Sequence, residues 1–270
     1  GGKETGRQVV QQDVDKIIFT GSVQTGREIM KESSSKIHKL LFELGGKDPA
    51  IVCSDADMAY AAKKIVRSAC NNTGQVCCAV ERVYVEANAY DKFVSKAVEE
   101  AKAIKVGNPE LAKTEIGPFA SKFQMDVCID HLNDAQSKGA KIEFGGKRIK
   151  GKGYFFEPTV ITNIDHSMKI MTDETFAPII PIMKVNSIDE AIRYANDSIY
   201  GLTGSVWTKD IEKGNKIARQ LQVGVAGINK HGGGGAGSAW GGSKLSGIGR
   251  LGSREGTHEF TNIKTLRMNK

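Results

Sequence analysis

Residues 72–86 read NTGQVCCAVERVYVE and place two adjacent thiols in a loop between a helical segment and a strand. A helix is expected over about residues 58–72, and residues 81–86 alternate as a strand does. The junction leaves backbone N–H groups free to stabilise a developing negative charge. Because an ordinary thiol has a pKa of about 8.5, a nucleophilic Cys77 requires surroundings that favour its thiolate.

A second stretch, LFELGGK at residues 41–47, places Glu43 within an apolar run that ends in two glycines. A carboxyl group in apolar surroundings resists ionisation, which suits a general base that works near neutral pH. Taken singly, Cys77 is more often a core residue and Glu43 more often a residue at a strand edge. The two together favour a nucleophile and its base.

The combination resembles the two signature motifs of the aldehyde dehydrogenase superfamily, E-L-G-G-K and G-Q-x-C, and the separation of 34 positions (77 − 43) also fits. The resemblance implies that Cys77 is the nucleophile, in preference to its neighbour Cys78, and that Glu43 is the general base. It further implies an α/β fold, with the family's three-layer α/β catalytic domain and an incomplete Rossmann-like cofactor domain.

Residues 16–27 read KIIFTGSVQTGR, in which a buried-strand pattern leads through a glycine turn into a helix. The N-terminus of a helix binds anions through its free N–H groups and the helix dipole. The segment resembles the family's F-T-G-S segment, which implies that Ser22 contacts the pyrophosphate of a dinucleotide and that Gly21 and Gly26 border it. The resemblance also assigns Leu44 to the cofactor site. A simple helix cap is the alternative role for Ser22.

Residues 173–178 read DETFAP and resemble the family's E-x-F-G-P motif, with Ala177 where glycine is usual. The resemblance implies that Glu174 binds the hydroxyls of the nicotinamide ribose and that Phe176 lies near the nicotinamide. By spacing alone, Glu174 is more often a solvated acid and Phe176 more often a core residue. Residues 240–250, WGGSKLSGIGR, resemble a late segment of the same family.

Strand and helix patterns alternate along the chain, which favours layered α/β architecture. We expect a partial dinucleotide-binding domain over residues 1–44, a thiol-bearing catalytic domain over residues 45–224, and a return segment with a C-terminal oligomerisation strand over residues 225–270. That strand is expected at residues 261–267. Residues 230–238 contain five glycines, which indicates either a mobile surface loop or a roomy substrate entrance.

The composition is that of an ordinary globular protein, with 270 residues, 40% hydrophobic and 26% charged. The net charge of +7 comes from 38 basic and 31 acidic residues spread along the chain, which argues against a nucleic-acid binder. The sequence contains no apolar run of about 18 residues, so no membrane span is expected. Five cysteines without a regular spacing favour free thiols in a reducing compartment, the cytoplasm. The five histidines are scattered, so we expect no metal site.

The predicted function is oxidation of a small-molecule aldehyde to a carboxylic acid, with NAD or NADP as cofactor and a covalent intermediate on Cys77. The resemblance covers only the C-terminal portion of the family. The isolated, truncated chain is therefore expected to be inactive, and the full-length form is expected to be a homo-oligomer. Two alternatives remain: a CoA-acylating relative, against which Glu43 argues, and an inactive scaffold or interaction fragment.

Overall fold

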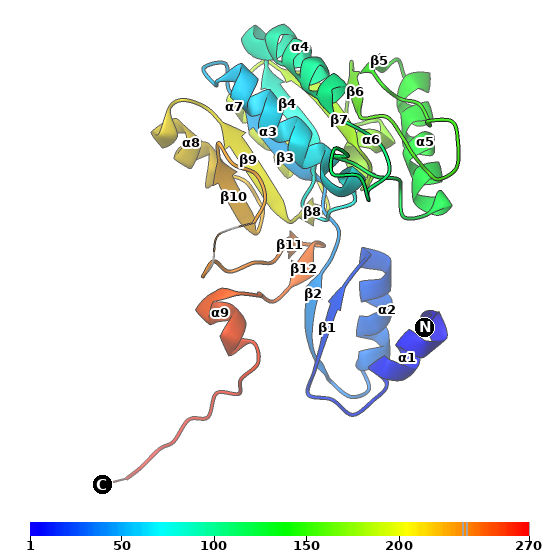
Figure 1. Cartoon of the computed structure of the whole chain (residues 1–270). Helices are drawn as coiled ribbons and strands as arrows, with labels where there is room; N and C mark the ends of the chain where they lie inside the picture. The colour runs from blue at the N-terminus through cyan, green and yellow to red at the C-terminus, as the bar shows by residue number, and fades with distance from the viewer. Residues whose placement is uncertain (234, 236, 270) are drawn as a thin grey trace.

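The structure, a computed structural model, describes residues 1–233, 235 and 237–269 and divides into two α/β lobes (Figure 1). A seven-stranded sheet in the order β10-β9-β3-β4-β7-β6-β5 forms the centre of the larger lobe. Neighbouring strands are parallel except β5 and β6. The strands are β3 (Asp48–Val52), β4 (Val80–Glu86), β5 (Lys141–Phe144), β6 (Thr159–Thr162), β7 (Ile179–Val185), β9 (Thr203–Trp207) and β10 (Val225–Ile228).

Helices cover both faces of this sheet and give the larger lobe three layers (Figure 1). Helices α3 and α4 pack on one face, and α5 to α8 pack on the other. Because both faces are covered, parallel strands are apolar along their length, and β3 and β9 are buried at all five positions. The helices are α3 (Met58–Cys70), α4 (Ala87–Ala103), α5 (Lys122–Ser137), α6 (Lys169–Thr172), α7 (Ile188–Asn196) and α8 (Ile211–Ala218).

The strand expected over residues 81–86 is present, but its exposure does not alternate. Strand β4 lies at the centre of the sheet, and six of its seven residues are buried. Two of these buried side chains, Glu81 and Arg82, are charged. A buried charge is costly unless it is paired and hydrogen-bonded, so each requires buried partners.

Side-chain caps set the starts of the main helices. Each capping side chain accepts the backbone N–H three residues later, and the caps are Ser22, Asp57, Ser121, Ser187 and Asp210. After α3 the chain continues through a short 3-10 turn, η1 (Asn71–Gly74), toward the two thiols. No described helix is both long and apolar enough to cross a membrane.

The smaller lobe is a three-stranded sheet in the order β1-β2-β12 with α1 and α2 packed on it (Figure 1). The return of the chain as β12 joins the late segment to the first strands. The domain boundaries at residues 44 and 224 stay predictions. The remaining elements are β1 (Lys16–Thr20), β2 (Lys39–Glu43), β8 (Tyr200–Gly201), β11 (Ser243–Lys244), β12 (Gly247–Ile248), α1 (Lys3–Val10), α2 (Val23–Ser33) and α9 (Ser253–His258).

Residues 261–267, expected to form an oligomerisation strand, are not paired with a strand in the described part of this single chain. These residues are extended and leave the smaller lobe without pairing to another described strand (Figure 1). The side chain of Ile263 is 95% exposed. Among the described residues no strand lies beside this segment to accept its backbone hydrogen bonds, and a strand without a neighbour is not stable. Pairing with a second subunit stays a prediction.

Candidate active site

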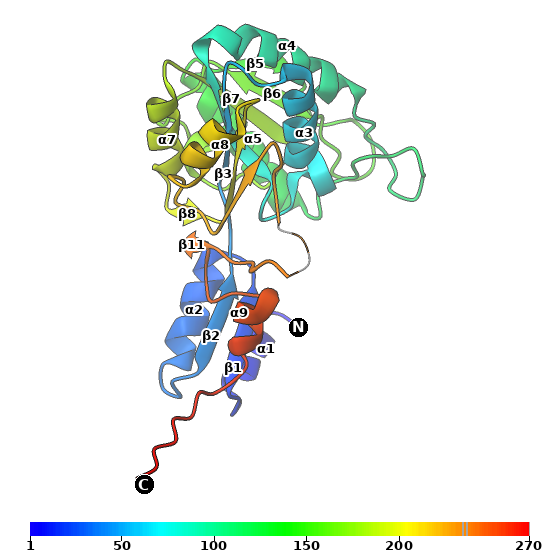
Figure 2. The same cartoon turned by 90° about the vertical axis from the view of Figure 1, so that its left-hand side faces the viewer.

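A short link places the end of one sheet opposite the start of the other. Strand β2 ends at Glu43, and residues 44–47 lead directly into β3 (Figure 2). Glu43 therefore lies at the carboxyl end of the small parallel pair, where open α/β sheets bind ligands. Cys77 and Glu174 lie in the loops before β4 and β7, at the amino end of the large sheet, so all three residues fall at this junction.

The two thiols occupy the central positions of a tight turn over residues 76–79. The N–H of Ala79 donates to the carbonyl of Val76 at 2.9 Å, which closes the turn. Cys77 and Cys78 are both partly exposed, whereas the other three cysteines are buried, and all five are free thiols. A reagent in solution can therefore reach the turn.

Two glycines allow other backbone segments to lie directly against this turn. Gly74 has a φ of +70°, in the region that favours glycine, and a Cβ there would overlap the carbonyl of Ala177. A Cβ on Gly46 would overlap the carbonyl of Cys77. The loops before β3, β4 and β7 are thus in direct backbone contact.

The surroundings of Cys77 favour its thiolate. A hydrogen bond from the Cys78 thiol, together with the backbone N–H groups of both residues, lowers the pKa of Cys77 from 9.0 to about 7, against the opposing effects of burial and of the Glu43 charge. The Cys78 thiol, which donates the proton, has a raised pKa for the same reason. Of the two thiols, Cys77 therefore has the lower pKa. Its role as nucleophile stays a prediction.

Glu43 is buried, with an exposed fraction of 4%, and neither of its carboxylate oxygens has a hydrogen-bond partner among the described residues. Burial raises the pKa of this carboxyl, and the nearby Trp240 indole and Arg250 guanidinium partly oppose the rise. A buried carboxyl without a hydrogen-bond partner is rare and costly, so it calls for an explanation. Because the Glu43 charge acts on Cys77, the two groups share one electrostatic environment.

Glu174 reaches the same junction from the loop before β7. Its Oε1 accepts the N–H of Gly46 at 2.9 Å, and a Cβ on Gly45 would overlap its carboxylate. Burial and the charge of Glu81 raise the pKa of Glu174 to about 7. Phe176, two residues on, is half-buried and has a φ of +52°, a strained conformation for a bulky residue.

The substitution of alanine for the family's glycine at position 177 leaves the backbone unstrained. Ala177 is buried and is not among the residues with positive φ. The turn therefore accepts a Cβ at this position.

We expect Glu174→Gln to stabilise the chain above neutral pH. An acid whose folded pKa is raised from 4.5 to about 7 binds its proton more tightly when folded, so stability is highest below 4.5 and falls as pH rises toward 7. The neutral amide removes that loss and keeps an acceptor for Gly46. Thermal unfolding should show a gain of about 3 kcal/mol at about pH 8 and a smaller one at about pH 5. An equal gain at both pH values would show that ionisation of Glu174 is not the cause.

A buried ion pair fixes the loop that carries Glu174 and Phe176. Lys47 Nζ lies 2.6 Å from Glu81 Oε2, and the two side chains are 0% and 5% exposed. Glu81 also accepts the N–H of Thr175 at 2.7 Å and the N–H of Phe176 at 2.8 Å. These charge-assisted bonds position the loop relative to β3 and β4. They also account for the buried charge of Glu81.

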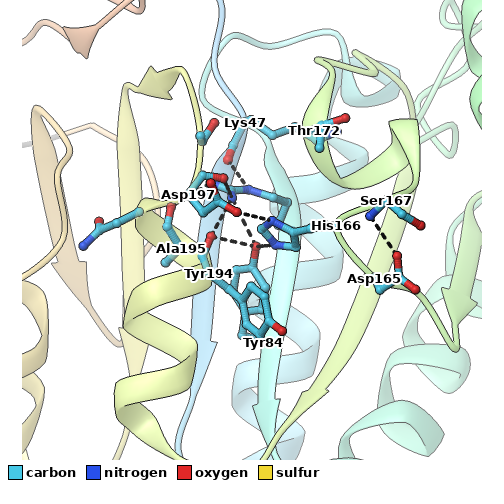
Figure 3. Close-up of polar contacts among 12 residues, drawn as sticks. Lys47, Tyr84, Asp165, His166, Ser167, Thr172, Tyr194, Ala195 and Asp197 are labelled. Carbon is cyan, nitrogen blue, oxygen red and sulfur yellow. Dashed lines mark hydrogen bonds and ion pairs between the residues drawn. The ribbon is translucent and has the colours of Figure 1, made fainter.

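Arg82 ties the same region to α7. Its Nε donates to the carbonyl of Lys47 at 2.7 Å, and its terminal nitrogens donate to the carbonyls of Tyr194 and Ala195 at 3.0 and 2.9 Å. The carbonyls of Tyr194 and Ala195 lie in the last turn of α7, where a cation is favoured by the helix dipole. Figure 3 shows these carbonyl-bearing residues together with Tyr84, whose hydroxyl Arg82 contacts at 3.1 Å.

Tyr84 continues this network toward the surface. Its hydroxyl lies 2.9 Å from His166 Nε2, and His166 Nδ1 lies 3.1 Å from Asp197 (Figure 3). Burial raises the pKa of Tyr84 to about 12 and, with Arg82, lowers the pKa of His166. The network thus fixes the backbone at Lys47, next to the junction, and ends at Asp197.

A model of the aldehyde dehydrogenase family matches residues 1–266. The chain belongs to the aldehyde dehydrogenase family. It is 40% identical over 264 residues to betaine aldehyde dehydrogenase of Bacillus subtilis (strain 168). The aligned region covers 96% of this chain and 54% of that relative.

Solved aldehyde dehydrogenase structures confirm the predicted family fold. Betaine aldehyde dehydrogenase from Staphylococcus aureus, in complex with NAD+, matches with a TM-score of 0.92 and 40% identity over 96% of this chain and 52% of that one. The aldehyde dehydrogenase of Mycobacterium tuberculosis, also complexed with NAD+, matches with a TM-score of 0.93 and 38% identity over 97% and 55%. The chain spans about half the length of the relatives it matches.

The residues predicted to bind cofactor divide between the helix start and the core. Ser22 caps α2 by accepting the N–H of Thr25 at 3.1 Å, so the cap role is present whether or not Ser22 also binds an anion. Gly21 donates its N–H to the carbonyl of Glu43 at 3.1 Å. Gly26 and Leu44 are buried against each other in the small-lobe core. Their contact with a cofactor stays a prediction.

Sequence reasoning missed two buried residues beside the aldehyde dehydrogenase motifs, Asp48 and His231. Asp48 directly follows the glycine-lysine motif and is 1% exposed. His231 lies in the glycine-rich segment 230–238, where a surface loop or an open entrance was expected, yet its side chain is 2% exposed. The expectation is wrong for His231 because strand β9 supplies polar partners for it. Within that segment, residues 234 and 236 lie outside the described residues.

Proposed function

We propose that this chain supplies the nucleophile and the general base for NAD(P)-dependent oxidation of an aldehyde to a carboxylic acid. One observation carries the proposal: a partly exposed Cys77 whose pKa is lowered to about 7 shares its surroundings with Glu43, a buried carboxylate that has no hydrogen-bond partner in the described part of the chain. The structure of the S. aureus relative is described with a BME-free cysteine and, in another crystal, a BME-modified one. A reactive thiol in the family is therefore consistent with this role.

The chemistry follows from these two groups. Glu43, directly or through a water, takes the proton from Cys77, and the thiolate forms a C–S bond to the aldehyde carbon. The resulting oxyanion faces the backbone N–H of Cys77. A bound nicotinamide supplies the hydride acceptor that converts the thiohemiacetal to a thioester. After it has released the first proton to solvent, Glu43 takes a proton from water, and the hydroxide adds to the thioester carbon. The C–S bond then breaks, the acid leaves, and Glu43 returns a proton to the Cys77 sulfur.

The residues present suit a dinucleotide. The capped N-terminus of α2, an 11-residue helix, presents N–H groups suited to a pyrophosphate. Glu174 is partly exposed at the junction, where its carboxylate can accept ribose hydroxyls. Whether the cofactor is NAD or NADP depends on contacts to the adenosine ribose, and we assign none of the described residues to these. Phe176 is proposed to border the nicotinamide.

The full-length protein is proposed to act on a small aldehyde as a homo-oligomer in the cytoplasm, the compartment that free thiols favour. The betaine aldehyde dehydrogenase relatives indicate the class of substrate. Because those relatives are about twice as long as this chain, we expect the 270 residues alone to form little NADH from NAD+ and an aldehyde.

An activated ester tests the nucleophile and the base without a cofactor. Cys77 should attack 4-nitrophenyl acetate, release nitrophenolate and keep the acetyl group as a thioester. We expect an initial burst of about one nitrophenolate per chain, with the acetyl group on Cys77 by peptide mass spectrometry. Slow release of acetate should follow as Glu43 activates water.

Two variants separate the roles. Cys77→Ser should lose the burst. Glu43→Gln should keep it at about pH 8, where the lowered pKa of Cys77 already favours its thiolate, but should slow the later phase by about 100-fold or more. Cys78→Ser is the matched control, since it should retain a burst of about the same size. A full burst in Cys77→Ser would contradict the assignment of the nucleophile. Acceleration of the later phase by CoA instead of water would favour a CoA-acylating enzyme.

A further inference from the structure

A polar cluster lies beneath the thiol-bearing turn, formed by Asp48, Thr203, Ser205 and His231. Asp48 begins β3, and Thr203 and Ser205 lie on β9, its neighbour in the sheet. After β10 the chain reverses at Asn229, which has a φ of +52°, and brings His231 back over β9. The imidazole is then enclosed, with 2% of its side chain exposed. Neither the E-L-G-G-K motif nor the G-Q-x-C motif predicts that His231 is buried here.

The chemistry of the partners fixes the direction of each hydrogen bond to His231. The indole of Trp207 only donates, and it lies 3.0 Å from Ser205 Oγ. Ser205 accepts that bond, and its hydroxyl also lies 2.9 Å from His231 Nδ1. The carbonyl of Cys78 only accepts, so His231 Nε2 carries the proton that it shares with this oxygen at 3.1 Å. In a neutral ring Nδ1 then carries no proton, so Ser205 donates its hydroxyl proton to Nδ1.

The other contacts agree with a neutral imidazole. Burial lowers the pKa of His231 to about 4 and raises the pKa of Asp48 well above its ordinary value. Asp48 Oδ2 lies 3.8 Å from His231 Nε2, and Asp48 hydrogen-bonds both the N–H and the hydroxyl of Thr203. His231 Nε2 also lies 3.2 Å from the Thr203 hydroxyl. The carbonyl of Cys78 thus meets an N–H dipole and no imidazolium charge.

We propose that His231 is a positioning residue for the nucleophile, which fixes the turn presenting the Cys77 sulfur by donating a hydrogen bond to the carbonyl of Cys78. The inference rests on the proposed role of Cys77. The turn is held at both of its central carbonyls: that of Cys77 lies against Gly46, and that of Cys78 is held by His231. With both fixed, the Cys78 thiol and the backbone N–H groups stay directed at the Cys77 sulfur.

The same bonds exclude His231 as the base for Cys77. Its Nδ1 lone pair accepts the proton of Ser205, and its Nε2 already carries a proton directed at a carbonyl. The ring therefore acts on the sulfur only through the backbone of the turn. This arrangement differs from a cysteine–histidine pair, in which the imidazole hydrogen-bonds the sulfur itself.

The test compares His231→Leu with His231→Gln in the full chain, with His258→Gln at an exposed histidine as control. Alkylation of Cys77 by iodoacetamide is followed by peptide mass spectrometry across about pH 5 to 10. His231→Leu lacks an N–H, so Cys77 should react about tenfold more slowly at about pH 7, with its midpoint moved upward. The amide N–H of His231→Gln should restore most of the rate, and His258→Gln should change nothing.

Unchanged kinetics in a folded His231→Leu variant would overturn this inference and leave the proposed function standing. The absence of preferential Cys77 alkylation in the unaltered chain would instead overturn the proposed function. Nitrogen NMR of the unaltered chain decides independently of variant folding, since it should show His231 protonated at Nε2 alone. Ser205→Ala should weaken that preference. A proton on Nδ1, or an imidazolium at about pH 7, would contradict the inference.

Discussion

Lys47→Met should lower the free energy of unfolding by about 3–5 kcal/mol, because it leaves the carboxylate of Glu81 buried without its cation. The ammonium and carboxylate lie 2.6 Å apart and are 0% and 5% exposed, so water cannot replace the lost partner. The same carboxylate orders the backbone of Thr175 and Phe176. The loop that carries Glu174 should therefore loosen as well.

Denaturant unfolding measures the loss, and an exposed ion pair gives the matched control. Lys96 and Glu99 lie 2.7 Å apart with 38% and 58% of their side chains exposed. Lys96→Met should change stability by less than about 1 kcal/mol, since water screens and solvates both partners. If the two variants lost the same small amount, the buried pair would not be a main support of the site.

Gly74→Ala should destabilise the chain by about 3 kcal/mol or more and displace the thiol-bearing turn. An alanine at this position has to keep a φ of +70°, which costs about 1–3 kcal/mol. Its Cβ also overlaps the backbone of Ala177. Relief of that overlap requires the loop before β4 to move away from the loop before β7. The burst with 4-nitrophenyl acetate should then fall together with stability.

Gly6→Ala provides the control for this substitution. Gly6 lies in α1, and no atom of the described residues comes within 4 Å of the position that a Cβ would take there. Alanine should there stabilise the helix by up to about 1 kcal/mol. A Gly74→Ala variant with unaltered stability and a full burst would show that the close approach of the two loops is not required.

Local motifs were enough to place Cys77 and Glu43 on loop and strand ends, because each lies where one element stops. Strand β1 and helix α7 also follow from their own residues, since hydrophobic spacing and a capping serine are local signals. The glycines of the LFELGGK stretch could be recognised by resemblance. Their physical reason, the nearness of Glu174 and of the Cys77 carbonyl, appears only once three loops are brought together.

Other features depend on partners distant in sequence. The local sequence around Lys47 and Glu81 does not show that both side chains are buried, since either could have been a solvated charge. The burial of His231 was not predicted because its neighbours are rich in glycine, a composition that favours exposure. Its hydrogen-bond partners lie on β9, far away in the sequence. The extended residues 261–267 have a strand-like sequence, yet a strand forms only where a neighbouring edge accepts its hydrogen bonds.

Selective alkylation at limiting iodoacetamide tests the central claim most directly, because it measures the ionisation of each thiol in the unaltered chain. Cys77 should react first, with a midpoint near pH 7, as its lowered pKa requires. Cys53 and Cys70, whose pKa values burial raises to about 11 and about 12, should react far more slowly. Uniform labelling of the five cysteines, or a Cys77 midpoint at the ordinary value of about 8.5, would contradict an activated thiol at this junction.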